Sequence, residues 1–230
     1  VTLTERILQP EEFQVNLQLC KKDFRQDWES ASMGFSQYDN LPRKFSDFLI
    51  AQVAAKVAEK VEQNIWQGAT ANAGEFDGFQ ALLAADGDVV DVSGTTLSAA
   101  NIIAELGKVV DAIPSGVYNK EDLKIYIPTS AAKFYIQAQA ALGYRELYNV
   151  GKTEMNFQGI ELFTASGLGA NKIVAAESSN LFFGTGLLND WQEVKLIDMA
   201  DIDGSQNVRV VLRGSAGVQH GIGSDIVLYS

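Results

Sequence analysis

A long amphipathic segment at residues 46–67 constrains the fold more than any other part of the sequence. Apolar residues recur in it at spacings of three and four, which predicts a helix with one buried face: Ile50, Val53, Ala54, Val57, Val61 and Ile65. Ser46 can act as the N-cap, Asp47 lies in the first turn where the helix dipole favours negative charge, and Gly68 can end the helix. At 1.5 Å per residue such a helix would be about 30 Å long. It could form a spine on which sheets are laid, or a simple core helix.

The segments before this helix show different periods. Residues 13–19 alternate strictly between apolar and polar side chains, which predicts a strand with one solvent-exposed face. Residues 2–8 are expected to form a short extended strand that leads into Pro10. Residues 21–30 are expected to form a short helix around Phe24 and Trp28.

The rest of the chain mixes helices with short strands. Helices are predicted at residues 98–113 and 130–142, and strands at 89–92, 123–127, 160–164, 172–176, 181–183, 193–197, 208–212 and 226–229. Glycines are expected to interrupt the last strands, at a bend or a crossing between two sheets: Gly214, Gly217, Gly221 and Gly223. Because no regular βαβ repeat is present, the predicted fold class is α+β.

Charge and size limit the possible functions. The chain has 230 residues, which fits one large domain or two small ones. With 18 basic and 29 acidic residues, the net charge is −11, which disfavours a protein that binds nucleic acid through surface cations, although a local basic patch is not excluded. No apolar stretch approaches the length of a membrane span, and no signal peptide is recognised, so no membrane association is expected.

Cysteine and histidine are each present once. Cys20 excludes an intrachain disulfide and a thiolate metal cluster, and it is interpreted as a small apolar residue beside Leu19. A Ser-His-Asp triad would have to use His220, yet Ser215 misses the spacing of a nucleophile elbow by one residue. His220 is therefore interpreted as an exposed or strand-edge residue, and no catalytic or metal-binding residues are predicted.

Three other patterns resemble fragments of binding motifs. Gly167-Leu168-Gly169 and Gly221-Ile222-Gly223 lack the third glycine that opens a helix in a dinucleotide loop, so both are interpreted as turns between strands. Residues 201–204 lack the remaining ligands of a calcium loop and are interpreted as a solvated turn. Asp86, Asp88 and Asp91 are assigned to a hairpin. Among 29 acidic residues no spacing singles out an acid–base pair, so no cofactor is predicted.

Further motifs follow one another in a set order along the chain. They are an extended segment at Val1–Leu8, the strand Phe13–Leu19, the helix from Phe45 to Gly68, the turn Phe76–Leu83, the segments 97–113 and 119–143, Leu142-Gly143-Tyr144-Arg145, Asn156–Leu162, Asn180–Gly186 and Val208–His220. In this order they resemble the tailed-phage major capsid family of the Hong Kong 97 type, whose fold is shared with encapsulin shells. Each motif alone is degenerate, and the order carries the resemblance. Thr185 stands where the family has an acidic residue.

The resemblance implies a Hong Kong 97-type capsid fold with two domains. Residues 1–92 and 193–219, including the spine helix 46–67, would form a peripheral domain. Residues 93–192 and 220–230 would form an axial domain. The segment Val208–His220 would then be one long peripheral strand. The family's N-terminal arm and the outward half of its extended loop are expected to precede Val1, and loss of that arm should weaken the contacts that lace subunits together.

The function implied by the resemblance is structural. The chain would be a non-enzymatic subunit of a bacteriophage or prophage icosahedral capsid, which self-assembles into capsomers and encloses the genome. It would be located in the virion capsid after assembly in the bacterial cytoplasm. The implied partners are further copies of the chain and also scaffolding or portal proteins, with no sequence-specific nucleic-acid binding. There are two alternatives: an encapsulin-like compartment that recruits cargo and, less readily, a hydrolase with an acidic pair.

Overall fold

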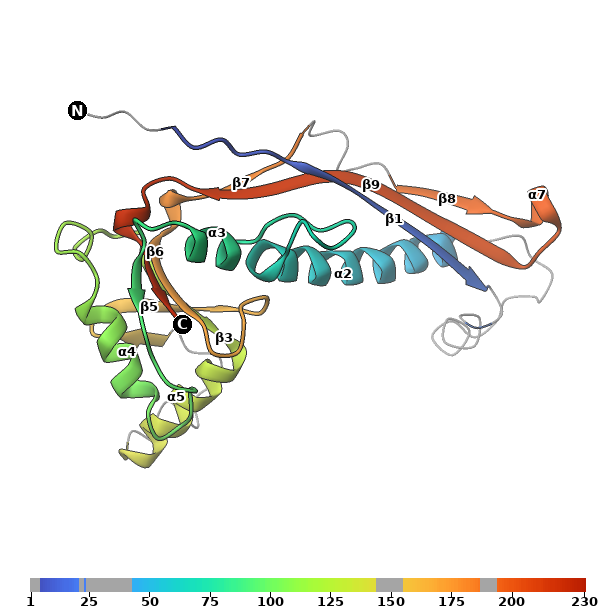
Figure 1. The fold of residues 1–230 in the computed structure, drawn as a ribbon. Helices are drawn as coiled ribbons and strands as arrows, with labels where there is room; N and C mark the ends of the chain where they lie inside the picture. The colour runs from blue at the N-terminus through green and yellow to red at the C-terminus, as the bar shows by residue number, and fades with distance from the viewer. Residues whose placement is uncertain (1–4, 21–22, 24–42, 144–154, 187–193) are drawn as a thin grey trace. The chain divides into compact units, whose positions relative to one another are not determined.

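The structure of the chain is a computed structural model that describes residues 5–20, 23, 43–143, 155–186 and 194–230. Helices and strands alternate irregularly along it, and most paired strands are antiparallel (Figure 1). This arrangement confirms the predicted α+β class.

Contacts within the chain group it into two compact units. Unit 1 comprises residues 1–9, 62–184 and 217–230, and unit 2 comprises residues 10–61 and 185–216. The division falls inside the helix α2 (Arg43–Gln67) and inside the strand β9 (Asn207–His220), so each of these elements contributes residues to both units.

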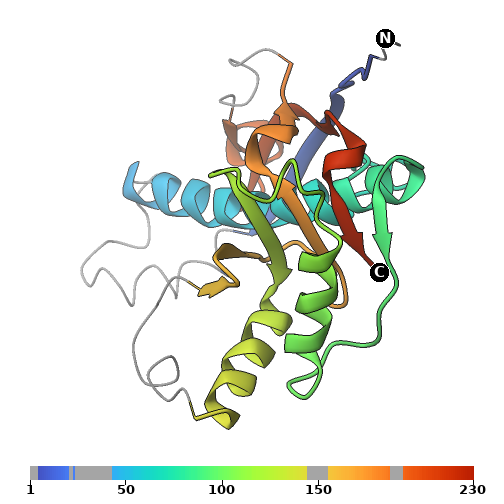
Figure 2. The same ribbon diagram turned by 90° about the vertical axis from the view of Figure 1, so that its left-hand side faces the viewer.

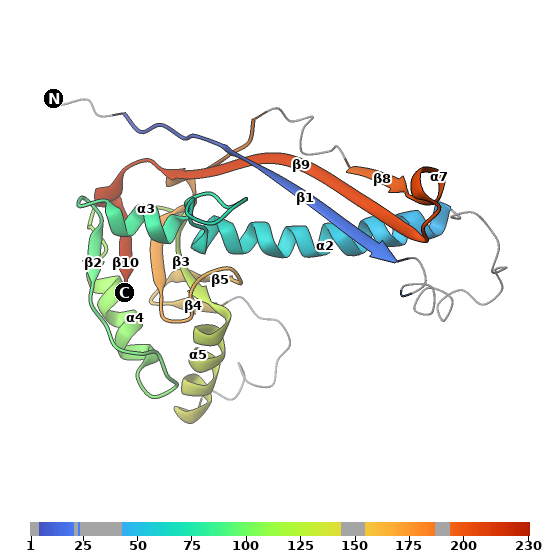
Figure 3. The ribbon, with the colours of Figure 1, turned by 45° about the vertical axis from the view of Figure 1, so that its right-hand side comes forward.

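A six-stranded sheet forms the centre of unit 1. Across the sheet the strands are β2 (Val90–Val92), β10 (Val227–Tyr229), β6 (Ile173–Glu177), β3 (Leu123–Pro128), β5 (Ile160–Ala165) and β4 (Met155–Phe157). The pairs β10–β2 and β3–β5 are parallel, and the other three pairs are antiparallel. Strands distant in sequence therefore lie side by side (Figure 3).

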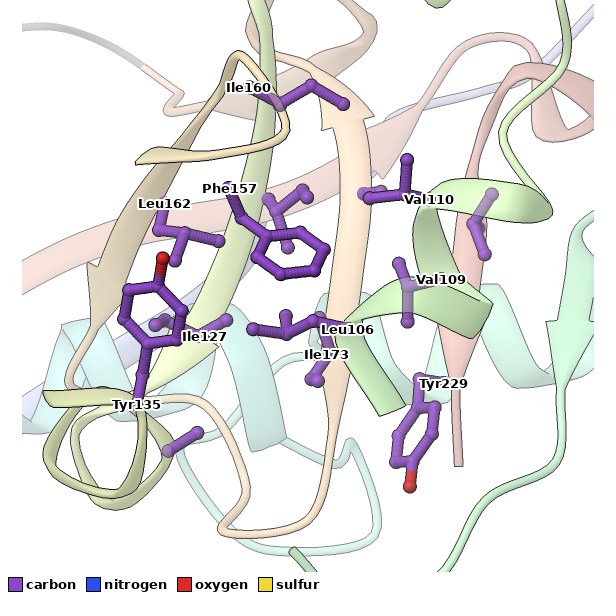
Figure 4. Close-up of a cluster of buried hydrophobic side chains, with 14 of the residues drawn as sticks. Leu106, Val109, Val110, Ile127, Tyr135, Phe157, Ile160, Leu162, Ile173 and Tyr229 are labelled. Carbon is purple, nitrogen blue, oxygen red and sulfur yellow. The ribbon is translucent and has the colours of Figure 1, made fainter. Parts of the chain in front are cut away.

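Two helices pack on one face of this sheet. α4 (Ile102–Asp111) and α5 (Thr129–Ala141) contact each other and the strands β3, β5, β6 and β10 (Figure 2). Figure 4 shows Leu106 and Val109 of α4 beside Ile173 of β6, and all three side chains are fully buried. Burial of such a side chain contributes roughly 1.5–3 kcal/mol, so this cluster is the main source of stability in unit 1.

The opposite face of β3 carries aromatic residues. Tyr126 alternates with the core residues of β3, so it points away from α4 and α5. Its ring lies 5.2 Å from that of Trp66 at the end of α2, and Trp66 lies 5.5 Å from Phe79 of α3 (Phe79–Ala85). The side chain of Gln67 donates a 2.6 Å hydrogen bond to the carbonyl of Gly167, which fixes the turn between β5 and β6.

Unit 2 contains an antiparallel sheet centred on β9. β1 (Glu11–Cys20) pairs along β9 on one side, and β8 (Val194–Asp198) pairs on the other (Figure 3). Val208 of β9 packs with Leu49 of α2 in a small core to which neighbouring apolar residues add. The last residues of β9 belong to unit 1, where they pair with β7 (Leu181–Gly184).

Most predicted elements are confirmed. These include the spine helix, the strand at residues 13–19, the helix at 130–142 and the strands near residues 90, 125, 162, 175, 182, 195 and 228. The helix predicted from residue 98 begins at Ile102, because residues 98–101 form a turn in which Asn101 Oδ1 accepts the Ser98 N–H at 2.7 Å. Apart from residue 23, the helix expected at residues 21–30 lies outside the described residues, as does the Tyr144-Arg145 part of one motif.

Several local predictions are wrong. Residues 5–8 are not a strand, since they make no ladder of backbone hydrogen bonds. Ser46 does not cap α2, which already includes Arg43. Gly214 and Gly217 do not interrupt β9, which continues for 14 residues, as the family resemblance implied. A Cβ on Gly214 would lie 2.9 Å from the Phe13 ring, so the lack of a side chain at Gly214 leaves room for the Phe13 ring of the neighbouring strand β1.

Candidate functional site

His220, the only histidine, lies at the end of β9 and is buried, with 1% of its surface exposed. Of the two expected alternatives, an exposed or a strand-edge residue, the exposed one is wrong, while His220 is the last residue of β9 and pairs there only with β7 among the described strands. Its Nε2 lies 2.8 Å from Asp86 Oδ2, and the same oxygen lies 2.5 Å from Arg6 Nη2. The pKa of Asp86 is held below its ordinary value, chiefly by the hydrogen bond with His220, and further by the Asp88 N–H and by Arg6.

The environment of this histidine does not match a catalytic triad. In a triad one ring nitrogen bonds a carboxylate and the other bonds the nucleophile's hydroxyl. Here Nδ1 is buried and has no hydrogen-bond partner among the described residues. Ser215, the serine nearest to an elbow motif, accepts a 2.9 Å hydrogen bond from the Gly186 N–H in unit 2. The described chain thus contains an Asp–His pair without a nucleophile on its second nitrogen.

A second buried polar cluster joins α4 to the C-terminal strand of unit 1. The carboxylate of Glu105 lies 2.8 Å from Lys108 Nζ, 2.9 Å from the Tyr229 hydroxyl and 3.1 Å from Thr95 Oγ1. The hydrogen bond to Lys108 is the main cause of the lowered pKa of Glu105. Burial, together with the neighbouring Glu105, raises the pKa of Tyr229 to about 12. Each of these polar groups forms a hydrogen bond with another member of the cluster, so the cluster has a structural role.

The carboxylates of the described chain are poorly suited to acid catalysis. Every described carboxyl group with a resolved shift has a lowered pKa, because a cation, hydroxyl or amide donates to it: Glu59, Asp86, Glu105, Asp122 and Asp203. A general acid at neutral pH needs a raised pKa. Within the described residues, no group of three or more His, Cys, Asp or Glu side chains could hold a metal ion.

The sequence fragments that resemble binding motifs lie in turns and short elements of the fold. Gly167–Gly169 forms the turn between β5 and β6, and Gly221–Gly223 lies between β9 and β10. Ala200–Asp203 forms the short helix α7, which ends at Gly204 in a left-handed conformation (φ 72°). Asp86 and Asp88 lie between α3 and β2, while Asp91 lies within β2, so the predicted hairpin is wrong: β2 pairs in parallel with β10.

A shallow depression in unit 1 lies beside the strands β4 and β5. It has a volume of about 400 Å³ and is lined mainly by polar side chains from residues 118–123 and 156–161. Lys120, one of these residues, pairs with Glu177 at 2.6 Å. Ligand sites are usually lined mostly by apolar side chains with a few convergent polar groups, and the polar lining of this depression does not match that pattern.

Exposed apolar side chains indicate a candidate binding surface more clearly than the depression does. In unit 1, Phe182 of β7 is 50% exposed and Ile222 is 59% exposed. Asn180 holds the Ile222 backbone through two 2.8 Å hydrogen bonds, and a Cβ on Gly221 would lie 3.2 Å from the Phe182 ring. The two side chains therefore form an exposed apolar surface. Among the described strands β7 pairs only with β9. Exposed apolar surface is a feature of proteins that bind other chains.

Comparisons with known proteins identify the fold. No family model and no curated protein matches the chain. Solved structures match over almost its whole length: a capsid of a native GTA particle (12% identity, 96% of this chain and 72% of that chain, TM-score 0.65) and a Gordonia phage Cozz structure (12%, 100% and 76%, TM-score 0.61). An encapsulin complex from Synechococcus elongatus matches at 11% identity over 96% of this chain and 73% of that chain, with a TM-score of 0.55.

None of the described helices is long and apolar enough to cross a membrane. The structural match extends over at least 96% of this chain in each of these three structures, although sequence identity is only 11–12%. The chain therefore has the Hong Kong 97-type fold of tailed-phage capsid proteins and encapsulins.

Proposed function

We propose that the chain is a structural subunit of an icosahedral phage or prophage capsid, without enzymatic activity. The observation that carries this proposal is the fold match over nearly the whole chain to the capsid of a GTA particle and to a phage structure. Shells arise when many copies of one subunit make the same contacts under closed symmetry, so further copies of the chain are its main partners. Scaffolding and portal proteins are additional proposed partners, and the virion is the proposed location.

Two properties of the chain support a structural role. Buried polar groups such as those of the Glu105–Lys108–Tyr229 cluster pair with one another, and the hydrogen bond from Lys108 lowers the pKa of the Glu105 carboxyl rather than raising it. Its net charge of −11 would also repel a packaged polyanion, so the genome could slide past the shell wall without adhering to it.

The peripheral and axial domains remain a proposal. Residues 1–92 and 193–219 would form the peripheral domain, and residues 93–192 and 220–230 would form the axial domain. The boundaries of the two compact units differ from this division, because unit 1 groups residues 62–92 and 217–219 with most of the proposed axial domain. Assembly contacts mapped onto the sequence by cross-linking would decide which division applies in a shell.

Electron microscopy of the full-length product tests the shell role. After expression and purification over a range of salt and pH, we expect closed particles and a sedimentation coefficient far above that of a 25.0 kDa monomer. A matched sample carrying Leu106→Ala, which weakens the buried core of unit 1, should give fewer particles because less folded subunit is present. Absence of particles under every condition, from a folded product, would overturn the proposal.

An encapsulin-like compartment is the second candidate, because an encapsulin complex has the same fold. The two candidates differ in what the shell encloses. Purified particles of a capsid should contain nucleic acid or be empty, whereas a compartment should contain a co-purified protein at a fixed ratio. Mass spectrometry and the ultraviolet absorbance ratio of the particles separate these outcomes.

A further inference from the structure

Residues 5–9 are attached to unit 1 although they form no secondary structure there. The segment is exposed except for Leu8, which is half-buried. With little apolar area removed from water, and with no ladder of backbone hydrogen bonds, a chain segment of this kind is held by a few side-chain contacts or not at all. We call residues 5–9 the strap.

Among the described residues, three contacts hold the strap. The guanidinium of Arg6 pairs with Asp86 at 2.5 Å. The carbonyl of Ile7 accepts a 3.3 Å hydrogen bond from Gln219 Nε2. The Leu8 side chain packs on Gly184 of β7, where an added Cβ would overlap it. The ion pair is the strongest of the three, because a charge-assisted bond to a mostly buried carboxylate exceeds a long neutral hydrogen bond.

Two contacts that do not involve Arg6 also hold the Asp86 side chain. Its Oδ1 accepts the Asp88 N–H at 3.1 Å, and its Oδ2 lies 2.8 Å from His220 Nε2. An ionised carboxylate only accepts hydrogen bonds, so His220 Nε2 donates to Asp86 Oδ2. His220 Nδ1 is buried and has no hydrogen-bond partner among the described residues. Gly223 leaves room for the pair, since a Cβ there would overlap Asp86 and lie 3.3 Å from Arg6 Nη2.

We propose that Asp86 is a latch, positioned by His220, that holds the strap closed on unit 1 through Arg6. The groups facing the Asp86 carboxylate are Arg6 from the strap, His220 from β9 and the Asp88 N–H from the turn after α3. Loss of its charge removes the ion pair, and the strap then detaches while the sheet beneath it persists. This device concerns the conformation of the subunit and goes beyond the proposed shell role, because the latch sets where residues 5–9 lie on unit 1.

Limited proteolysis of the chain tests the latch. Trypsin must take the Arg6 side chain into its own pocket, so it cleaves the Arg6–Ile7 bond only when the strap is open. We expect Asp86→Asn to speed this cleavage about five- to tenfold, with rates at other Lys and Arg sites unchanged. Glu59→Gln removes the exposed Lys56–Glu59 pair and is the matched control, with no change at Arg6.

A second measurement covers the case in which Asp86→Asn loosens the whole unit and all sites are cleaved faster. Arg6→Gln leaves the Asp86–His220 pair intact, and hydrogen exchange of the strap amides should then rise severalfold while exchange in β3 and β6 stays at the wild-type rate. Unchanged cleavage in Asp86→Asn with unchanged strap exchange in Arg6→Gln would overturn the latch, as would equal acceleration of every region in both variants. Both experiments use the unassembled chain, so their failure says nothing against shell assembly.

Discussion

Tyr229 shows how one residue can join two elements in this fold. Its hydroxyl accepts the Thr95 N–H at 2.9 Å and lies 2.8 Å from the Thr95 carbonyl and 2.9 Å from Glu105 Oε2. The hydroxyl has a single proton, so only one of these two oxygens receives it at a time. Because the cluster is buried, each group depends on the others for its hydrogen bonds.

Tyr229→Phe should lower the free energy of unfolding by about 1–3 kcal/mol, because the Thr95 N–H loses its acceptor and Glu105 loses a donor. Urea denaturation measures the change. Tyr118→Phe is the control, since the Tyr118 ring is partly exposed and its hydroxyl makes only a 3.4 Å contact with the Gln158 carbonyl. Equal effects of the two substitutions would contradict a special role for Tyr229.

The same hydroxyl predicts a pH dependence of stability. Burial and Glu105 raise the pKa of Tyr229 to about 12, whereas an unfolded tyrosine titrates near pH 10. The folded chain thus favours the protonated form, so this contribution is complete below about pH 10 and is lost as the pH rises towards about 12. Between these values the wild type should lose more stability than Tyr229→Phe. Parallel loss in both proteins would show that Tyr229 is not responsible.

At the scale of elements, period and length decide what can be predicted. The long helix, the 13–19 strand and the buried strands near residues 125 and 175 follow from hydrophobic periodicity. β4 and α7 are three and four residues long, too short for any period to appear. α3 has seven residues and begins directly after Gly78, where a turn is the local expectation. These short elements are stabilised by packing in the folded chain rather than by local preference.

Gly167 provides a test of how the β5–β6 turn packs on the end of α2. A Cβ there would overlap the backbone carbonyl of Glu62, which cannot swing aside as a flexible side chain could. Gly167→Ala should therefore lower the free energy of unfolding by about 1–3 kcal/mol. Gly116→Ala, at a position with open space, should be neutral or slightly stabilising. Thermal melting compares the two, and similar melting temperatures would argue against the close contact.

At the scale of the whole molecule, charge governs the interaction with nucleic acid. The net charge of −11 predicts that the purified chain does not retard a double-stranded DNA fragment in a gel at about 0.1 M salt, and that lower salt makes little difference. Affinity that rises steeply as salt is lowered would instead reveal a basic patch that the overall charge conceals.

The α+β class, the long helix and the presence of only one histidine and one cysteine follow from the sequence alone, because periodicity and residue counts can be read without knowing which residues meet. The tertiary structure alone places Arg6, Asp86 and His220 together, since no spacing relates positions 80 and 134 residues apart. It also decides that Gly214 lies within a strand, because the cause is the Phe13 ring of another strand. Long-range contacts depend on how the chain folds back on itself, and local sequence patterns do not determine this.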